Sequence, residues 1–342
     1  MVRNRGATIA DIARHVGLTG ITVSRALNRP EMVKPATRER IRQAAHDLGY
    51  VPNAFARGLK RSESRLIGVV TSSVDNPFYA EMIKAISRHA KRHDYAVLLF
   101  DTDGEAWLEA NAIRTLLSYQ VAGIILSPVS DEPDYQPDYL AQLKASEIAV
   151  VQLDRVLHGA DFSAVVLDNV WAGQRAAAHL LDRVFDAGTI ETGAPARLLV
   201  AAGPEHSRIS RERLQGVRNT LASVEHAVKV DVLWGDYTLN PALTDVGSFL
   251  DHYGPPRAIF GLNQLITLGA LKALKSRGIP HDSLHVVGID RLPYIDIFGI
   301  TVPCVVHDGY QAGQDALTLL LEHVNKPQQP ARTITVRGEL LE

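Results

Sequence analysis

The pattern that most constrains this chain begins at Leu66, where short apolar runs start to alternate with amphipathic stretches. The first runs are LIGVVTS, AVLLFDTD, AGIILSP and IAVVQLD, separated by stretches such as FYAEMIKAISRHAKRH and EANAIRTLLSYQ. Repeated strand–helix units predict a mainly parallel, doubly wound α/β sheet. After AVVLDN the alternation resumes through RLLVAAG, VKVDVLW, AIFGLN and HVVGID. We therefore expect two similar α/β subdomains, and 46% hydrophobic residues in a chain of 342 suffice for conventional cores.

Two such subdomains create a cleft, because ligands of doubly wound sheets bind beyond the carboxyl ends of the strands. We expect an N-subdomain of residues 66–166 and 304–328 and a C-subdomain of residues 167–303 and 329–342. Carboxylates, amides and guanidinium groups just past the strands suit a polyhydroxylated ligand, since a wrong ligand leaves them unpaired. The candidates are Asp75 to Tyr79, Ser127, Asp154, Arg155, the stretch 208–213, Tyr237, Asn263, Gln264, Asp290 and Arg291.

Charge is divided unevenly along the chain. Residues 1–65 hold 13 Lys and Arg against 5 Asp and Glu, a net +8, so the rest of this chain of net charge −2 carries −10. A basic segment suits a polyanion such as nucleic acid, because Lys and Arg displace its condensed counterions. Charge alone also fits a solvated basic tail.

Helical periodicity in residues 8–48 argues against a tail. In TIADIARHVG the apolar residues Ile9, Ile12, Ala13 and Val16 follow the spacing of one helical face, with Thr8 at the N-cap. The stretches TVSRALN and PATRERIRQAAHDLG repeat that spacing, so three short helices can share one core. Two helices joined by the tight turn GLTG indicate a helix-turn-helix, whose second helix enters the major groove of DNA.

The head carries a specific pattern as well. TIADIARHVGLTGITVSRALN followed by TRERIRQAAHDLGYVPNAFARGL resembles the DNA-binding head of the lactose/galactose repressor (LacI/GalR) family, and RPEMV after Asn28 is most similar to the gluconate-type repressors. The resemblance implies that Thr19, Gly20, Ile21 and Arg25 occupy base-reading positions and that Thr22 and Ser24 contact phosphate. Gly20 and Ile21 replace a polar pair that several members carry. Further implied DNA contacts are Thr8, Asn28, Asn53, Ala56, Leu59 and Lys60.

We expect three parts: a helix-turn-helix domain (1–52), a hinge helix and linker (53–65) and the ligand-binding and dimerisation body (66–342). NAFARGLK is shorter than the roughly 12 residues at which isolated helices become marginal, so it should be helical only when supported. The resemblance implies that this hinge orders on DNA beside its dimer mate and pushes Leu59 into the minor groove. A flexible linker with Leu59 packed on the body is the alternative.

The body resembles the sugar-binding core of the same family, through DNPFYAEMIKAI, VAGIILSP, VVQLDR, GPEHSRISRERLQGVRNTL and HVVGIDR. The resemblance implies a periplasmic-binding-protein-like fold, with Arg213, Asn263 and Asp290 gripping effector hydroxyls or a carboxylate. More weakly implied contacts are Phe78, Tyr79, Ser127, Asp154, Arg155, Tyr237 and His307, each of which could instead be a structural wall or cap.

Two departures from the family pattern bear on the effector. Gln264 and Arg291 stand where many members carry aspartate, which removes two carboxylates. An acidic sugar then becomes plausible, because guanidinium groups pair bidentately with carboxylates. The alternative is that Arg155 and Arg291 pair with Asp154 and Asp290 at the rim of the cleft, and the effector is a neutral sugar.

Motifs of other protein classes are missing from the sequence. We find no P-loop, GxSxG or HExxH motif, expect no enzyme activity, cofactor or metal, and interpret the single cysteine, Cys304, as a core residue. His89 and His93 lie one helical turn apart but without a carboxylate at ligand spacing. No apolar run approaches the roughly 20 residues of a membrane span and no signal peptide is apparent, so we expect a cytoplasmic protein.

These features predict a homodimeric transcription regulator that binds a palindromic operator, because each helix reads one half-site and two-fold symmetry repeats it. The expected action is repression released by a small sugar or sugar-acid effector, coupled from the cleft to the hinge. Sequence leaves open a purine-type co-repressor, in which the ligand strengthens DNA binding.

Overall fold

The computed structural model describes residues 7–51, 64–186, 196–223 and 228–342. The chain forms two compact units, Met1–Glu63 and Ser64–Glu342. The expected hinge contacts Asn53, Ala56, Leu59 and Lys60 lie outside the described residues and remain predictions.

The head is a bundle of short helices. These are α1 (Ile9–Val16), α2 (Gly20–Asn28), the 3₁₀ turn η1 (Pro30–Met32) and α3 (Pro35–Asp47). Thr8 begins α1 with a capping box: its hydroxyl accepts from Asp11 N at 3.3 Å, and Asp11 Oδ2 accepts from Thr8 N at 2.9 Å. The three helices share a core that includes Ile12, Val23 and Ile41, all fully buried. The expected helix-turn-helix is therefore confirmed.

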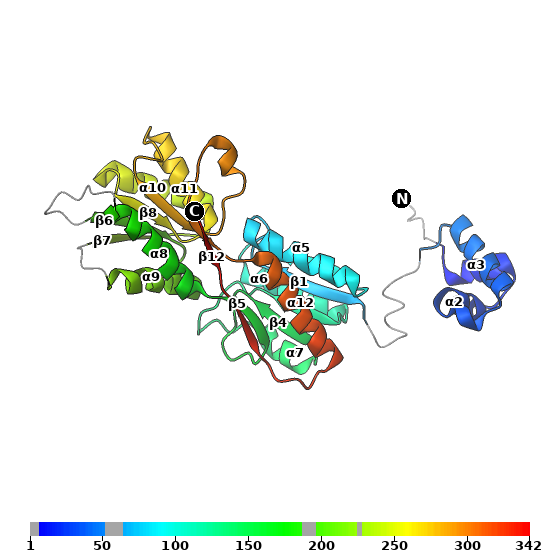
Figure 1. Cartoon of the computed structure of the whole chain (residues 1–342). Helices are drawn as coiled ribbons and strands as arrows, with labels where there is room; N and C mark the ends of the chain where they lie inside the picture. Colours follow the sequence, from blue (N-terminus) through cyan, green and yellow to red (C-terminus); the bar gives the residue numbers. More distant parts are fainter. Residues whose placement is uncertain (1–6, 52–63, 187–195, 224–227) are drawn as a thin grey trace. The chain divides into compact units, whose positions relative to one another are not determined.

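The N-subdomain is one parallel sheet between two pairs of helices (Figure 1). Its strands are β1 (Leu66–Thr71), β2 (Ala96–Asp101), β3 (Gly123–Leu126), β4 (Ala149–Leu153), β5 (Ser163–Leu167) and β11 (Thr333–Val336), in the order β11-β5-β4-β3-β1-β2. One face packs on α5 (Pro77–Arg92) and α12 (Gly309–Asn325), and the other on α6 (Ala106–Ser118) and α7 (Tyr139–Ala145). Every strand end that carries a candidate ligand contact therefore points to the same edge.

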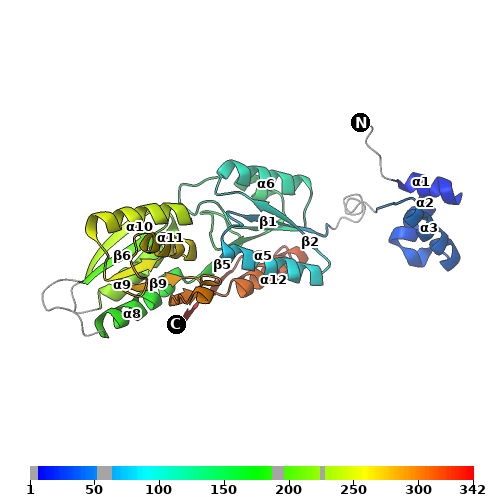
Figure 2. The same cartoon turned by 90° about the horizontal axis from the view of Figure 1, so that it is seen from above.

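The C-subdomain repeats this plan. Its strands are β6 (Ala196–Ala202), β7 (Val228–Trp234), β8 (Ala258–Gly261), β9 (His285–Ile289), β10 (Cys304–Val306) and β12 (Glu339–Leu341), in the order β12-β10-β9-β8-β6-β7. Only β12 runs antiparallel to its neighbour among the described strands. Helices α8 (Asn169–Asp186) and α9 (Arg208–Leu221) cover one face, and α10 (Leu239–Tyr253) and α11 (Gln264–Ser276) the other (Figure 2).

The chain passes between the subdomains three times, and two of the expected boundaries are wrong. Residues 304–306 form β10 of the C-subdomain sheet, not part of the N-subdomain, because they pair in parallel with β9. Residues 333–336 form β11 of the N-subdomain sheet, because they pair with β5. The crossings therefore lie after β5, between β10 and α12, and between β11 and β12.

Candidate functional site

Helix α2 has one small face that is exposed to solvent. Val23 and Ala26 are buried in the core, which leaves Gly20, Ile21 and Arg25 on the opposite side, exposed to solvent. Ile21 is 67% exposed, unusual for a large aliphatic residue. An apolar side chain suits a thymine methyl group, and an arginine suits the acceptors of guanine, so this face can read the edges of base pairs.

The hydroxyl residues around α2 also have structural partners. Thr19 is the N-cap, and its Oγ1 accepts from Thr22 N at 3.2 Å and lies 2.9 Å from Thr22 Oγ1. Asn28 Nδ2 donates to Ser24 O at 2.9 Å. These bonds fix the start and the end of the helix, while its first backbone N–H groups can meet a phosphate.

A buried hydroxyl–carboxylate group lines the N-subdomain side of the cleft. Tyr79 donates to Asp154 Oδ2 at 2.7 Å, and Ser127 donates to the Tyr79 oxygen at 3.2 Å. Burial and the neighbouring Asp154 carboxylate raise the pKa of Tyr79, so its phenol stays protonated and remains a donor. Asp154 directly follows β4 in the left-handed backbone region, with φ 68°. Such strain in a non-glycine residue concentrates at functional sites.

Arg155 and Tyr237 connect the two sides of the cleft. The Arg155 guanidinium lies 5.5 Å from the centre of the Tyr237 ring, and its Nη1 donates to Val129 O at 2.8 Å. Asn263 Nδ2 donates to Tyr237 O at 3.0 Å, while Asn263 Oδ1 caps α11 by accepting from Ile266 N at 2.7 Å. The alternative interpretation, in which Arg155 forms an ion pair with Asp154, is not what the structure shows: Arg155 makes backbone and aromatic contacts.

A second buried polar group surrounds Arg213 in the C-subdomain. Arg213 Nε donates to Asn169 Oδ1 at 2.9 Å and Nη1 to Leu262 O at 2.5 Å, and Nη2 lies 3.9 Å from Asp290 Oδ2. Asp290 Oδ1 lies 3.2 Å from His307 Nδ1. Like Asp154, Asp290 follows its strand with a positive φ, here 65°.

The ionised form of Asp290 is favoured by its neighbours. Burial alone raises the pKa of Asp290, but the hydrogen bonds and charge of His307, together with Arg213, outweigh burial and hold that pKa below its usual value. A buried carboxylate that stays charged is a strong acceptor for hydroxyl groups of a ligand.

Phe78 and Gln264 complete the cleft. The Phe78 ring packs against Tyr79 at 6.2 Å and against His307 at 6.4 Å between ring centres, so it joins the two polar groups. Gln264, 3% exposed, lies across the cleft 2.7 Å from Asn76 Oδ1. In the orientation that gives both the nitrogen and the oxygen of the Gln264 amide a partner, its nitrogen donates to Arg291 O at 2.6 Å and its oxygen accepts from Phe78 N at 3.1 Å.

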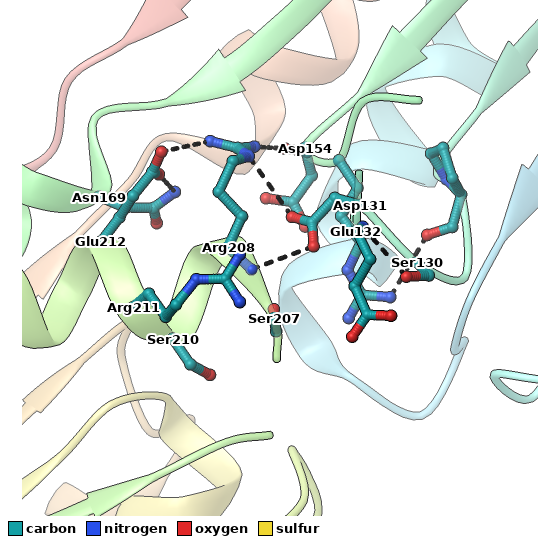
Figure 3. A network of polar contacts seen from close by, with 12 residues as sticks. Ser130, Asp131, Glu132, Asp154, Asn169, Ser207, Arg208, Ser210, Arg211 and Glu212 are labelled. Carbon is teal, nitrogen blue, oxygen red and sulfur yellow. Dashed lines mark hydrogen bonds and ion pairs between the residues drawn. The ribbon is translucent and has the colours of Figure 1, made fainter. Parts of the chain in front are cut away.

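Contacts between the subdomains also surround Arg208, at the start of α9. Figure 3 shows its side chain between the N-subdomain residues Asp131 and Asp154 and the C-subdomain residue Glu212. Arg208 Nη2 donates to Asp154 O at 3.2 Å, and Nη1 to Glu212 Oε1 at 2.7 Å. Glu212 Oε2 in turn accepts from Asn169 Nδ2 at 3.1 Å.

The structure brings seven of the ten expected effector residues into one connected set, from Ser127 and Asp154 through Tyr79, Phe78, His307 and Asp290 to Arg213. The other three, Arg155, Tyr237 and Asn263, contact one another. Asp131 and Asn169 were missed by sequence reasoning, although Asn169 lies just past β5 and fits the strand-end rule, whereas Glu212 lies within the expected stretch 208–213. Arg291 is exposed. Five buried atoms of the described cleft residues have no hydrogen-bond partner: Asp131 Oδ2, Asp154 Oδ1, Arg155 Nε, Arg208 Nε and His307 Nε2. Such atoms are the ones a ligand can satisfy.

The described ranges contain no cluster of three or more potential metal ligands and no helix long and apolar enough to cross a membrane. Cys304 is buried, and burial raises the pKa of its thiol to about 11, which agrees with a core residue.

Comparisons with known proteins match both units. Residues 64–336 match the family described as periplasmic binding proteins and sugar binding domain of LacI family, and residues 8–53 match bacterial regulatory proteins, lacI family. The fold and sites thus define a DNA-binding regulator with a ligand-binding body. The chain belongs to the LacI family.

Individual relatives align along nearly the whole chain. It is 28% identical to the HTH-type transcriptional repressor CytR of Escherichia coli, over 93% of this chain and 90% of CytR. It is 27% identical to the transcriptional repressor PurR of Vibrio cholerae, over 98% and 97%. Among solved structures, a lac repressor dimer bound to operator and an anti-inducer superposes with a TM-score of 0.79 at 22% identity, covering 99% of this chain and 98% of that one.

Proposed function

We propose that this chain is a cytoplasmic repressor of carbohydrate genes that binds a palindromic operator through α2 and is released when a small effector occupies the cleft. The observation that carries the proposal is the pairing of an exposed reading face, Ile21 and Arg25, with a buried, strand-end polar cleft in the same chain. The reading face contacts DNA, and the cleft binds a small polyhydroxylated molecule.

The charge in the cleft favours a neutral sugar over a sugar acid. Four carboxylates lie near the guanidinium groups of three arginines. Asp131 and Glu212 pair with Arg208, and Asp290 approaches Arg213. The charges of Asp154 and Asp131 act on Arg155. Because these carboxylates already offset the guanidinium charges, a ligand carboxylate would gain little net attraction and would lie close to groups of its own charge. Hydroxyl groups can donate to Asp154 Oδ1 and pair with His307 Nε2, both buried without a partner among the described residues.

A homodimer is part of this proposal, because a palindromic operator presents two equivalent half-sites. The turn η2 (Ile295–Phe298) offers a surface for a second copy. Tyr294, Ile297 and Phe298 are 77%, 72% and 75% exposed, and three adjacent exposed apolar side chains are typical of an interface. Replacing Ile297 and Phe298 by glutamate should shift the chain toward monomer in sedimentation velocity, and an unchanged dimer would exclude this surface.

Operator selection tests the DNA-binding part of the proposal. The full chain is used to select duplexes from a random library, and we expect enrichment of one palindromic sequence. The double variant Ile21→Ala/Arg25→Ala should lose that enrichment, since it removes the exposed reading face. Arg42→Ala is the matched control, because Arg42 is an exposed arginine of α3 that pairs with Glu39. Selection of unrelated sequences without symmetry would reject the proposal.

A thermal-shift screen of the full chain tests the effector part. We expect neutral sugars to raise the melting temperature more than aldonates or nucleosides at equal concentration, and Arg213→Ala to abolish the increase. The stabilising sugar is then added to the selected operator complex. Release supports an inducer, whereas tighter binding would assign the co-repressor alternative.

A further inference from the structure

The N-terminus of α9 is capped from the opposite subdomain. Its own N-cap residue, Ser207, makes no side-chain cap bond. Instead Asp131, on the segment after β3, accepts from Arg208 N at 3.1 Å, and its Oδ2 lies 3.5 Å from Arg208 Nε. Asp131 is 2% exposed. A carboxylate at a helix N-terminus is stabilising, and here it also bridges the cleft (Figure 3).

The segment that carries Asp131 is held rigidly to its own subdomain. Glu109, fully buried in α6, accepts from Val129 N at 2.6 Å and from the hydroxyl groups of Tyr135 at 2.7 Å and Tyr139 at 2.5 Å. Arg155 Nη1 donates to Val129 O on the other side. These bonds attach the segment of Asp131 to the N-subdomain, so separation of the subdomains would break the contact of Asp131 with Arg208.

Arg208 is joined to the effector-binding residues by continuous polar contacts. Arg208 pairs with Glu212, Glu212 accepts from Asn169, and Asn169 accepts from Arg213. Arg213 then approaches Asp290. The contact across the cleft and the candidate effector contacts consequently belong to one network, in which moving α9 moves Arg213.

We propose that Asp131 and Arg208 form a latch that closes the cleft without an effector and positions Arg213 for binding. This inference rests on the proposed function, because it concerns the regulation of the same cleft. The latch and the effector both stabilise the closed arrangement of the subdomains. Each therefore lowers the free energy of closure that the other must supply. Loss of the latch leaves the separated arrangement more populated and Arg213 less well placed.

Distance measurements between spin labels test the latch in the full chain with neither DNA nor effector. Cys304→Ser removes the only cysteine, and labels are attached at Asp138→Cys and Gln215→Cys, both exposed and on opposite sides of the cleft. Labelled chain is mixed with excess unlabelled chain so that pairs within one chain dominate. We expect one main distance population, and in Asp131→Ala a second population at a different distance, with the closed-to-open ratio reduced about tenfold.

Two further variants distinguish loss of the latch from general destabilisation of the fold. Glu132→Ala removes the adjacent carboxylate, whose 3.7 Å pair with His206 of the C-subdomain is largely open to solvent and therefore weak, and should change the distances far less than Asp131→Ala. Arg208→Ala keeps the backbone bond to Asp131 and should give a smaller shift, and it provides the test if Asp131→Ala does not fold. Unchanged distances in a folded latch variant, or an equal shift in Glu132→Ala, would overturn the latch. Since no DNA or effector is present, this result is independent of whether the chain is a repressor.

Discussion

Replacing Gly173 by alanine should destabilise the body and displace the arginines of the cleft. Gly173 lies in α8 where it crosses α9, and a Cβ there would be 2.1 Å from Arg213 O. Gly216 of α9 makes the reciprocal approach, with Val170 O at 2.2 Å from its Cβ position. These backbone oxygens cannot rotate away, so the two helices must separate by about 1 Å.

The change in stability expected for Gly173→Ala is the difference between two opposing effects. Overpacking of this kind costs up to about 3 kcal/mol, while glycine to alanine in a helix gains up to about 1 kcal/mol. A net loss of about 2 kcal/mol corresponds to a fall in melting temperature of about 4–8 °C. Because α9 also carries Arg208 and Arg213, the same shift should weaken effector binding.

Differential scanning calorimetry of the full chain measures the change. Gly247→Ala is the matched control, since Gly247 is also helical but its Cβ would meet only the guanidinium of Arg277, which can move. We expect the control to melt close to the wild type. A Gly173→Ala protein that melts within about 1 °C of wild type, or together with Gly247→Ala, would refute the packing argument.

Three further outcomes are expected. Thr8→Ala removes the capping box and should lower the stability of α1 by about 0.5–2 kcal/mol. Hydrogen exchange should then show faster exchange of the backbone amides of α1, with those of α3 as the internal reference. Arg25→Ala should weaken binding to the selected operator by about 1–3 kcal/mol and to random duplex by less, measured by fluorescence anisotropy; equal losses would argue for a phosphate contact. Asp290 has a folded-state pKa below its ordinary 3.8, so the stability it contributes is present above that value and is lost as pH falls through the folded pKa. The stability difference between wild type and Asp290→Asn should therefore be constant near pH 6 and shrink below about pH 4 in urea titrations.

The head could be predicted from sequence because its signals are local. The spacing of Ile12, Ala13 and Val16 identifies the face that the structure buries, and Thr8 followed by Asp11 identifies the cap. Helical periodicity and capping depend on residues within one or two turns, so neighbours in sequence carry the information.

The assignment of strands to sheets could not be predicted in the same way. Cys304–Val306 is a short apolar run and Thr333–Val336 a short alternating one, and either could join either sheet. Which sheet each joins depends on pairing with β9 and β5, of which β5 is far from its partner β11 in sequence. Pairing between distant segments leaves no periodic signal in the strand itself.

The candidate site was predicted in part for the same reason. The strand-end rule places Asp154 and Asp290 at the cleft, because parallel strands end at one edge. It gives no partner for them, and the contact of Asp131 with Arg208 arises only when two subdomains face each other. Side chains that act across an interface need the geometry of both sides.

The three crossings between subdomains govern how the chain can acquire its structure during synthesis. The N-subdomain core includes Ala316 and Leu320 of α12, and its sheet is completed by β11, so its apolar face stays uncovered until residue 336 has been made. Translation from β5 to that point takes roughly 10–30 s at ordinary bacterial rates. During that interval the C-subdomain lacks β10 and β12 as well. Neither half can mature first on the ribosome, and nascent chains of this protein should be clients of chaperones until the final helix and strands emerge.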